Sequence, residues 1–140
     1  MLFKKFGNTY VLRMDKGEEI VSIITAFCVQ EKIFLGSVIG IGATDKVAVG
    51  SFDAKNKCYR LAEEIVGEFE IVSLIGNIST LNGEPLAHLH AVLSDTNNNT
   101  FGGHLFSAMV SITCEVFINA IDGKIERGFD ALTGANLLQE

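Results

Sequence analysis

The segment LAHLHAVLSDTNNNTFGGHLF, residues 86–106, predicts a β-hairpin around which the rest of the fold can be built. Apolar residues occupy the odd positions from 87 to 93, which is the period-two pattern of a half-buried strand. The run Asp95–Thr100 that follows is rich in residues that favour tight turns and left-handed backbone. Residues 101–106 can then form the return strand.

The hairpin carries all three histidines of the chain. His88 and His90 share the polar face of the first strand, and His104 lies on the return strand. If a three-residue loop closes the hairpin, Asp95 pairs with Asn99 and His90 lies directly opposite His104. Directly opposed residues have Cβ atoms roughly 4.5–5.5 Å apart, and a diagonal neighbour such as His88 stays within reach. The spacing therefore predicts that three imidazoles converge on one point.

Three converging imidazoles predict a metal site at His88, His90 and His104. Neutral imidazole nitrogen suits zinc, copper, nickel and iron. Three protein ligands with an open fourth position are typical of a catalytic or ligand-accepting site rather than a closed structural one. We therefore expect a divalent transition metal, with zinc as the first choice. The alternatives are an anion site, polar strand residues satisfied by backbone or water, and a bulge at Gly102–Gly103 that shifts the pairing.

The remaining sequence predicts one helix and a sheet. Asp15 and Glu18 form a capping-box arrangement, and apolar residues then repeat at helical spacing: Ile20, Ile23, Ile24, Phe27 and Cys28. Strand-like segments lie between turns rich in Gly, Asn, Asp and Lys, at residues 10–13, 36–43, 46–52, 58–62, 69–78, 86–94, 101–106 and 109–118. The pattern indicates a single α+β domain over residues 1–140, with a largely antiparallel, meandering sheet and one main helix packed on one face.

These residues also carry a family resemblance. The strings HLHAVLSD, FGGHL and the Thr-x-Glu of residues 113–115 resemble the signature of the PPC (plants and prokaryotes conserved) domain, and the general layout extends from about Thr9 to Leu132. The resemblance implies a compact α+β domain that assembles as a homotrimer and whose three histidines form a metal site. In plants this domain is attached to AT-hook segments that grip DNA. This sequence has no Arg-Gly-Arg-Pro core of an AT-hook, so it resembles a stand-alone prokaryotic member.

The charge of the chain argues against direct DNA binding. The formal net charge is −6, whereas nucleic-acid binding draws most of its nonspecific affinity from Lys and Arg. The basic residues are scattered in small groups with acids nearby, which we interpret as solvated surface: Lys4 and Lys5, Lys55 with Lys57 and Arg60, and Lys124 with Arg127. We expect a small-molecule ligand or a protein partner instead.

Cysteine usage and hydropathy favour a cytoplasmic protein. The three cysteines are odd in number and have no framework spacing, so no disulfide scaffold is predicted. Cys28 and Cys114 are expected in the interior and Cys58 at the surface. The longest hydrophobic run, residues 33–43, is well short of the roughly 20 residues of a membrane helix, and no signal peptide is recognisable.

The segment 109–118 adds a weak catalytic candidate and an interface prediction. Glu115 lies on its polar face and could orient a ligand histidine or accept a proton, although a glutamate exposed at a surface or between subunits needs no such role. The apolar positions, which include Val110 and Val116, together with Val72 and Leu74 offer more apolar surface than one helix covers. We therefore expect part of this stripe to be buried between subunits.

Two classes of function follow from this sequence. One is a noncatalytic assembly or regulatory module whose histidines hold a structural or signal-bearing ion. The other is a metal-dependent enzyme that acts on a small molecule through a metal-activated water. We favour the first, because an ion site without an evident acid–base partner is not yet an active site.

Overall fold

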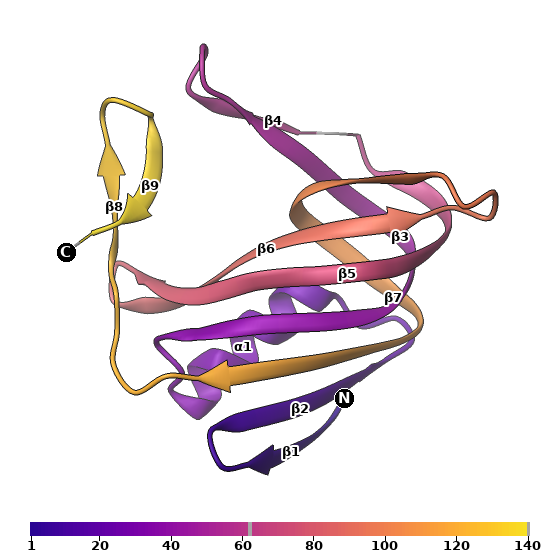
Figure 1. Cartoon of the computed structure of the whole chain (residues 1–140), viewed down its shortest axis with the longest axis horizontal. Coiled ribbons are helices and arrows are strands. Elements are labelled where there is room, and N and C mark those ends of the chain that lie inside the picture. The colour runs from indigo at the N-terminus through magenta and orange to yellow at the C-terminus, as the bar shows by residue number, and fades with distance from the viewer. Residues whose placement is uncertain (62, 140) are drawn as a thin grey trace.

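The computed structural model describes residues 1–61 and 63–139, which form a seven-stranded antiparallel sheet, one helix and a small separate hairpin (Figure 1). The sheet has the order β1-β2-β7-β6-β5-β3-β4. Its strands are β1 (Leu2–Phe6), β2 (Thr9–Asp15), β3 (Gly36–Asp53), β4 (Cys58–Leu61), β5 (Ile65–Leu81), β6 (Glu84–Ser94) and β7 (Thr100–Ala120). The helix is α1 (Ile20–Glu31), and the separate hairpin is β8 (Arg127–Asp130) with β9 (Ala135–Leu138). The predicted single domain with a mostly antiparallel sheet and one helix is confirmed, although strands make up far more of it than helix, and only β5, β6 and β7 follow one another as a meander.

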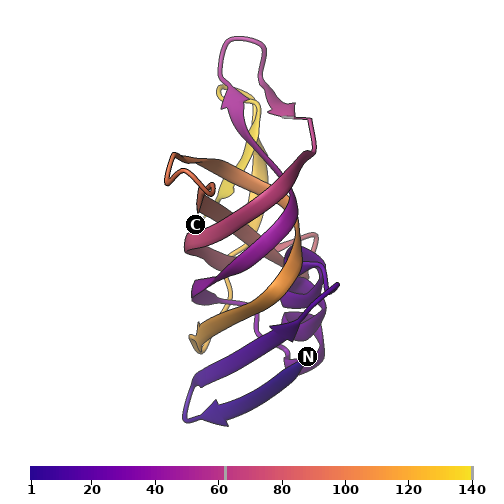
Figure 2. The ribbon, with the colours of Figure 1, turned by 90° about the vertical axis from the view of Figure 1, so that its right-hand side faces the viewer.

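Two long strands connect the sheet into a closed circuit. β3 pairs with β5 along one edge and with β7 along the other, while β6 pairs with both β5 and β7. Figures 1 and 2 show the resulting strong curvature of the sheet. The prediction of separate strands at 36–43 and 46–52, and again at 101–106 and 109–118, is wrong. Each pair is one strand whose register shifts at bulges, where the backbone bends without breaking the ladder.

Three observed strands were not predicted, and the predicted end of one further strand lies outside the described residues. β1 and β9 are short and mostly exposed, and β8 has only four residues, so none of the three shows the sustained apolar alternation that marks a half-buried strand. The strand predicted at residues 58–62 is observed as β4, and its predicted end at Ala62 lies outside the described residues.

The helix begins later than its predicted cap. Glu19, not Asp15, is the N-cap, because its carboxylate accepts hydrogen bonds from the backbone N–H groups of Val21 and Ser22. Glu18 does reach back to accept from the N–H of Asp15 at 2.8 Å, as the capping box predicts, but this pair closes the turn before the helix rather than capping it. At the other end Lys32 adopts the left-handed conformation and caps the last carbonyls.

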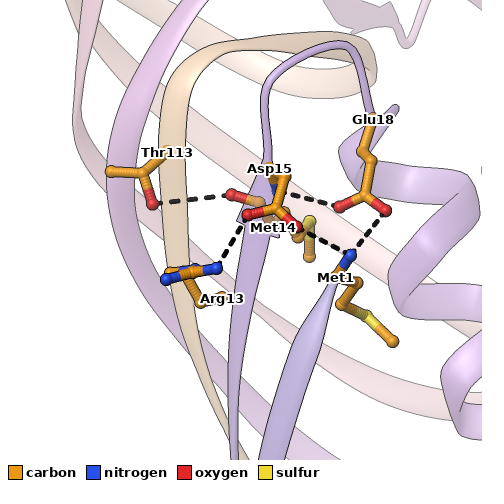
Figure 3. A network of polar contacts seen from close by, with 6 residues as sticks. All are labelled: Met1, Arg13, Met14, Asp15, Glu18 and Thr113. Carbon is orange, nitrogen blue, oxygen red and sulfur yellow. Dashed lines mark hydrogen bonds and ion pairs between the residues drawn. The ribbon is translucent and has the colours of Figure 1, made fainter.

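The same turn gathers a network of charges around the start of the chain (Figure 3). The N-terminal ammonium of Met1 lies 2.9 Å from carboxylate oxygens of both Asp15 and Glu18. Arg13 pairs with Asp15 at 3.0 Å, so one carboxylate contacts two cations. These contacts attach β1 to the β2–α1 turn at the exposed edge of the sheet.

The helix covers most of the apolar stripe of β7, so of the predicted interface set only exposed residues such as Val72 and Ile112 stay candidates for burial between subunits. Val110, Cys114, Val116 and Ile118 are fully buried in the core, as is Leu74, and the buried face of α1 packs against β6 and β7. These residues therefore belong to the interior of the monomer. Alternation placed Ile112 on the same face, but Ile112 is 72% exposed, because the β3–β7 register shifts beside it.

The opposite face of the sheet carries a second apolar set that is exposed. Ile39 pairs with Ile75 of β5 and with Phe117 of β7, and these three form a row across the strands. They are 56%, 57% and 45% exposed. We call Ile39, Ile75 and Phe117 the exposed apolar row.

Candidate metal centre

The β6–β7 hairpin has the predicted register. His90 pairs with His104, and the N–H of Asp95 donates to the carbonyl of Asn99 at 3.0 Å. Asn98 adopts the left-handed conformation with φ of 63°, which asparagine tolerates well. One carboxylate oxygen of Asp95 accepts from the N–H groups of Asn97 and Asn99, so Asp95 is the turn-capping residue that the sequence indicated. The strand ends therefore present all three histidines on one side.

The three imidazoles face one another. The ring centroids lie 5.3 Å apart for His88 and His90, 5.0 Å for His88 and His104, and 5.4 Å for His90 and His104. One ring nitrogen from each histidine can be chosen so that all three lie within 4.8 Å of one another. Among the described residues this is the only group of three or more His, Cys, Asp or Glu side chains so arranged. The predicted convergence is confirmed.

Burial keeps two of the three imidazoles neutral. His88 and His104 are half-buried, whereas His90 is exposed. Burial, followed by the charges of His88 and His90, lowers the pKa of His104 to about 4. Burial also lowers the pKa of His88, with Arg127 and His90 as further causes. At neutral pH these rings therefore carry free lone pairs and compete little with protons for a metal.

Aromatic and glycine residues form the packing around His104. Its ring lies 4.7 Å from that of Tyr59 on β4 and 4.8 Å from that of Phe106, measured between centroids. Gly50 of β3 pairs with His104, and a Cβ on Gly103 would lie 2.5 Å from the carbonyl oxygen of Gly50. Glycine is required at 103 because the backbones of β3 and β7 approach closely there.

Arg127 reaches the cluster from the separate β8–β9 hairpin, which stands beyond the sheet on the same side as β4 (Figures 1 and 2). Its side chain is only 8% exposed. Nη2 donates to Oδ1 of Asn77 at 2.9 Å and lies 3.3 Å from Nδ1 of His88. The interpretation of Arg127 as part of a solvated basic pair is therefore wrong, because charge spacing along a sequence does not report burial.

The other candidates lie where they contribute less. Glu115 is eleven positions beyond His104 on β7, where it pairs with Arg13 of β2 and Ile41 of β3, and the histidine group does not include it. Cys28 and Cys114 are buried and Cys58 is exposed, as predicted. Cys58 is on β4, which lies beside the histidines, but the ring that contacts His104 is that of its neighbour Tyr59.

The residues present fit a transition metal. Nδ1 of His104 is buried and has no hydrogen-bond partner in the described structure, a cost that a metal–nitrogen bond would remove. The donor set consists of three imidazoles, which zinc and its neighbours in the transition series bind well. His88, His90 and His104 would hold such an ion, and three protein ligands would leave it able to take up a further ligand such as water.

Fold and site together define a small antiparallel sheet domain with a three-histidine group at the end of its central hairpin. The chain belongs to the Plants and Prokaryotes Conserved (PCC, or PPC) domain family, whose model matches residues 1–122. A comparison with curated proteins found no match. Residues 123–139, which follow the matched region, include the hairpin that supplies Arg127.

Three solved structures share the fold over almost the whole chain. A protein from Bacteroides thetaiotaomicron with a provisional DNA-binding description has a TM-score of 0.94 and 31% identity, covering 99% of this chain and 96% of its own. A metal-containing protein from Archaeoglobus fulgidus has a TM-score of 0.89 and 35% identity, covering 100% and 99%. A plant- and prokaryote-conserved protein from Pyrococcus horikoshii has a TM-score of 0.88 and 35% identity, covering 99% and 95%.

No helix within residues 1–61 and 63–139 is long and apolar enough to cross a membrane.

Proposed function

We propose that this protein is a cytoplasmic, trimeric PPC-like domain that works as a metal-binding assembly or regulatory module, with a divalent ion on His88, His90 and His104. The observation that carries the proposal is the convergence of three imidazoles, one with a buried and unpartnered ring nitrogen. The metal content of the relative from Archaeoglobus fulgidus, 35% identical, supports it. Zinc is the metal we expect, because three imidazoles and an open position are a common zinc arrangement.

Elemental analysis of protein purified without an affinity tag or chelator tests the metal site. We expect about one zinc or related ion per chain in the wild type and none in His90→Ala. Asn97→Ala is the matched control, because Asn97 lies in the same hairpin but only its backbone N–H makes a recorded contact there. Metal-free wild type, or equal metal in His90→Ala, would refute the site.

The number of subunits, three, is what the family resemblance implies, and the exposed apolar row is the surface that we propose the subunits bury. Ile39, Ile75 and Phe117 adjoin one another across three strands, and a contiguous apolar patch of this kind is typical of a subunit interface. Burying these three side chains between copies of the chain would stabilise the assembly by removing apolar surface from water.

The mass of the protein in solution tests this interface. We expect a mass of three chains for the wild type and of one 15.1 kDa chain for Ile39→Glu, which should remain folded because residue 39 is exposed in the monomer. Leu132→Glu is the control, since Leu132 is an apolar residue, 83% exposed, in the β8–β9 turn. A trimeric Ile39→Glu protein would refute the proposed interface.

The alternative function is a metal-dependent enzyme acting on a small molecule. It is favoured by one observation, the exposure of His90, which makes one side of the histidine group accessible to solvent. A bound zinc would supply a water with a pKa lowered to about 7. Glu115 stays a weak candidate for the base, because within one chain it lies far along β7 from the histidines.

We expect no direct DNA binding by this chain, since its net charge is −6.

A further inference from the structure

Arg127 is a buried cation that has no acidic partner among residues 1–61 and 63–139. Its guanidinium donates to Oγ of Ser79 at 2.7 Å, to the carbonyl of Asn136 at 3.1 Å and to Oδ1 of Asn77 at 2.9 Å, all neutral acceptors. No carboxylate lies within 4.0 Å of it in the described residues. Buried charges are ordinarily paired, so an unpaired guanidinium beside a ligand site calls for a missing anion.

The position of the proton on the His88 ring shows when Arg127 would need that anion. A guanidinium only donates, so in the 3.3 Å contact between Nη2 of Arg127 and Nδ1 of His88 the ring nitrogen is the acceptor. If a metal binds Nδ1, the lone pair is used. If it binds Nε2, the ring proton moves to Nδ1, which then faces Arg127 as a second donor. In either case metal binding removes the acceptor that His88 provides.

The charge that the site would carry with a metal bound also favours an anion beside Arg127. The metal ligands are three neutral imidazoles, so a divalent ion beside Arg127 would carry its full charge next to a further positive charge. Asp and Glu are absent from the ligand group within the described residues. A small anion between the ion and Arg127 would compensate both positive charges. It would also accept the hydrogen bond from the Arg127 N–H that His88 no longer accepts.

Resting on the proposed metal site, we infer that Arg127 and the ion held by His88, His90 and His104 together bind a small carboxylate. One oxygen would face the ion and the other the guanidinium, which a carboxylate can do because its two oxygens share one charge. Asn77 and Ser79 are positioning residues, since they hold Nη2 and Nε of Arg127 in place. The ligand class of the module is therefore a small organic acid.

Calorimetric titration of the zinc-loaded full chain with acetate and with acetamide tests the inference. The two probes have nearly the same shape and differ in charge. We expect acetate to bind the wild type at least about tenfold more tightly than acetamide does. Arg127→Gln should lose most of the acetate affinity while its zinc content stays at the wild-type level, and Arg127→Lys should retain part of it.

Arg13→Gln is the matched control, because it removes the same charge from an arginine that is half-exposed and paired with Asp15 on β2. Its acetate affinity should stay within about twofold of wild type. Should Arg127→Gln fail to fold, Arg127→Lys takes its place, because it keeps the charge but loses the planar fork of donors, and its acetate affinity should fall below wild type at unchanged zinc content. Equal binding of the two probes by a zinc-loaded wild type overturns this inference alone, whereas a wild type that takes up no zinc overturns the metal site as well. Binding of inorganic phosphate but not acetate overturns the carboxylate assignment.

Discussion

Replacing Gly102 with alanine tests whether the close approach of β6 and β7 holds the histidines in register. A Cβ on Gly102 would overlap the carbonyl oxygen of Ala91 and lie 3.0 Å from Cα of Val92, whereas ordinary contact begins at 3.4 Å. Both obstacles are backbone atoms, so no rotamer change relieves them. The β6–β7 ladder has only five residue pairs, with Gly102 in the central pair and His90 and His104 in the last.

The expected loss follows from that short ladder. If about two of its hydrogen bonds are lost, at a net 0.5–1.5 kcal/mol each, the free energy of unfolding falls by about 1–3 kcal/mol. Zinc affinity should fall at least about tenfold, because the ligands end the same ladder. Urea unfolding measures the first quantity and competition with a zinc chelator the second.

Gly7→Ala provides a control with a similar loss of stability but a different cause. Gly7 has φ of +58° and an added Cβ would meet nothing within 4 Å. The strained backbone should cost about 1–2 kcal/mol and leave zinc affinity unchanged. A Gly102→Ala protein with wild-type stability and zinc affinity would refute the role assigned to this close approach.

Three further predictions follow from the same structure. In the metal-free protein the pKa of His104 is held at about 4, whereas an unfolded histidine titrates near pH 6.5, so the unfolded state takes up its proton first. The free energy of unfolding should therefore fall as the pH drops from about 6.5 towards 4, and urea unfolding should show a smaller fall in His104→Gln. Hydrogen bonds from Arg60, followed by those from Asn56, hold the pKa of Asp53 well below its usual range. Asp53→Asn should therefore lower the urea midpoint at pH 7, whereas Asp122→Asn, at an exposed position, should not. Leu89→Ala should cost about 2–5 kcal/mol in a calorimetric melt, because Leu89 is 1% exposed and anchors the strand between two metal ligands.

The candidate metal ligands could be predicted from the sequence because everything that places them is local. The alternation of residues 87–93 fixes which side His88 and His90 occupy, and the turn chemistry of Asp95 fixes the loop length. Register in a hairpin is set by its turn, so it can be read from a short stretch of chain. The three histidines converge as a consequence of these two local features.

Arg127 and the exposed apolar row could not be predicted because they depend on contacts between distant segments. Arg127 lies 39 positions after His88 and joins it only when the β8–β9 hairpin packs against β5. The exposed apolar row takes one residue from each of three strands, so it exists only once β3, β5 and β7 are paired in register, and the placement of α1 decides which face of the sheet is interior. Such choices are made by packing across the whole domain and leave no local signal.

The contact between Arg127 and His88 couples the two proposed ligands. A metal that takes the acceptor from Arg127 raises the affinity for an anion, and linkage requires that the anion raise the affinity for the metal by the same factor. Zinc affinity measured by chelator competition should therefore rise with acetate in the wild type, by the factor by which zinc raises acetate affinity. The effect should vanish in Arg127→Gln and persist in Arg13→Gln. A zinc affinity indifferent to acetate in the wild type would mean that the ion and the guanidinium act separately, and the buried charge of Arg127 would then serve only to hold β8 against β5.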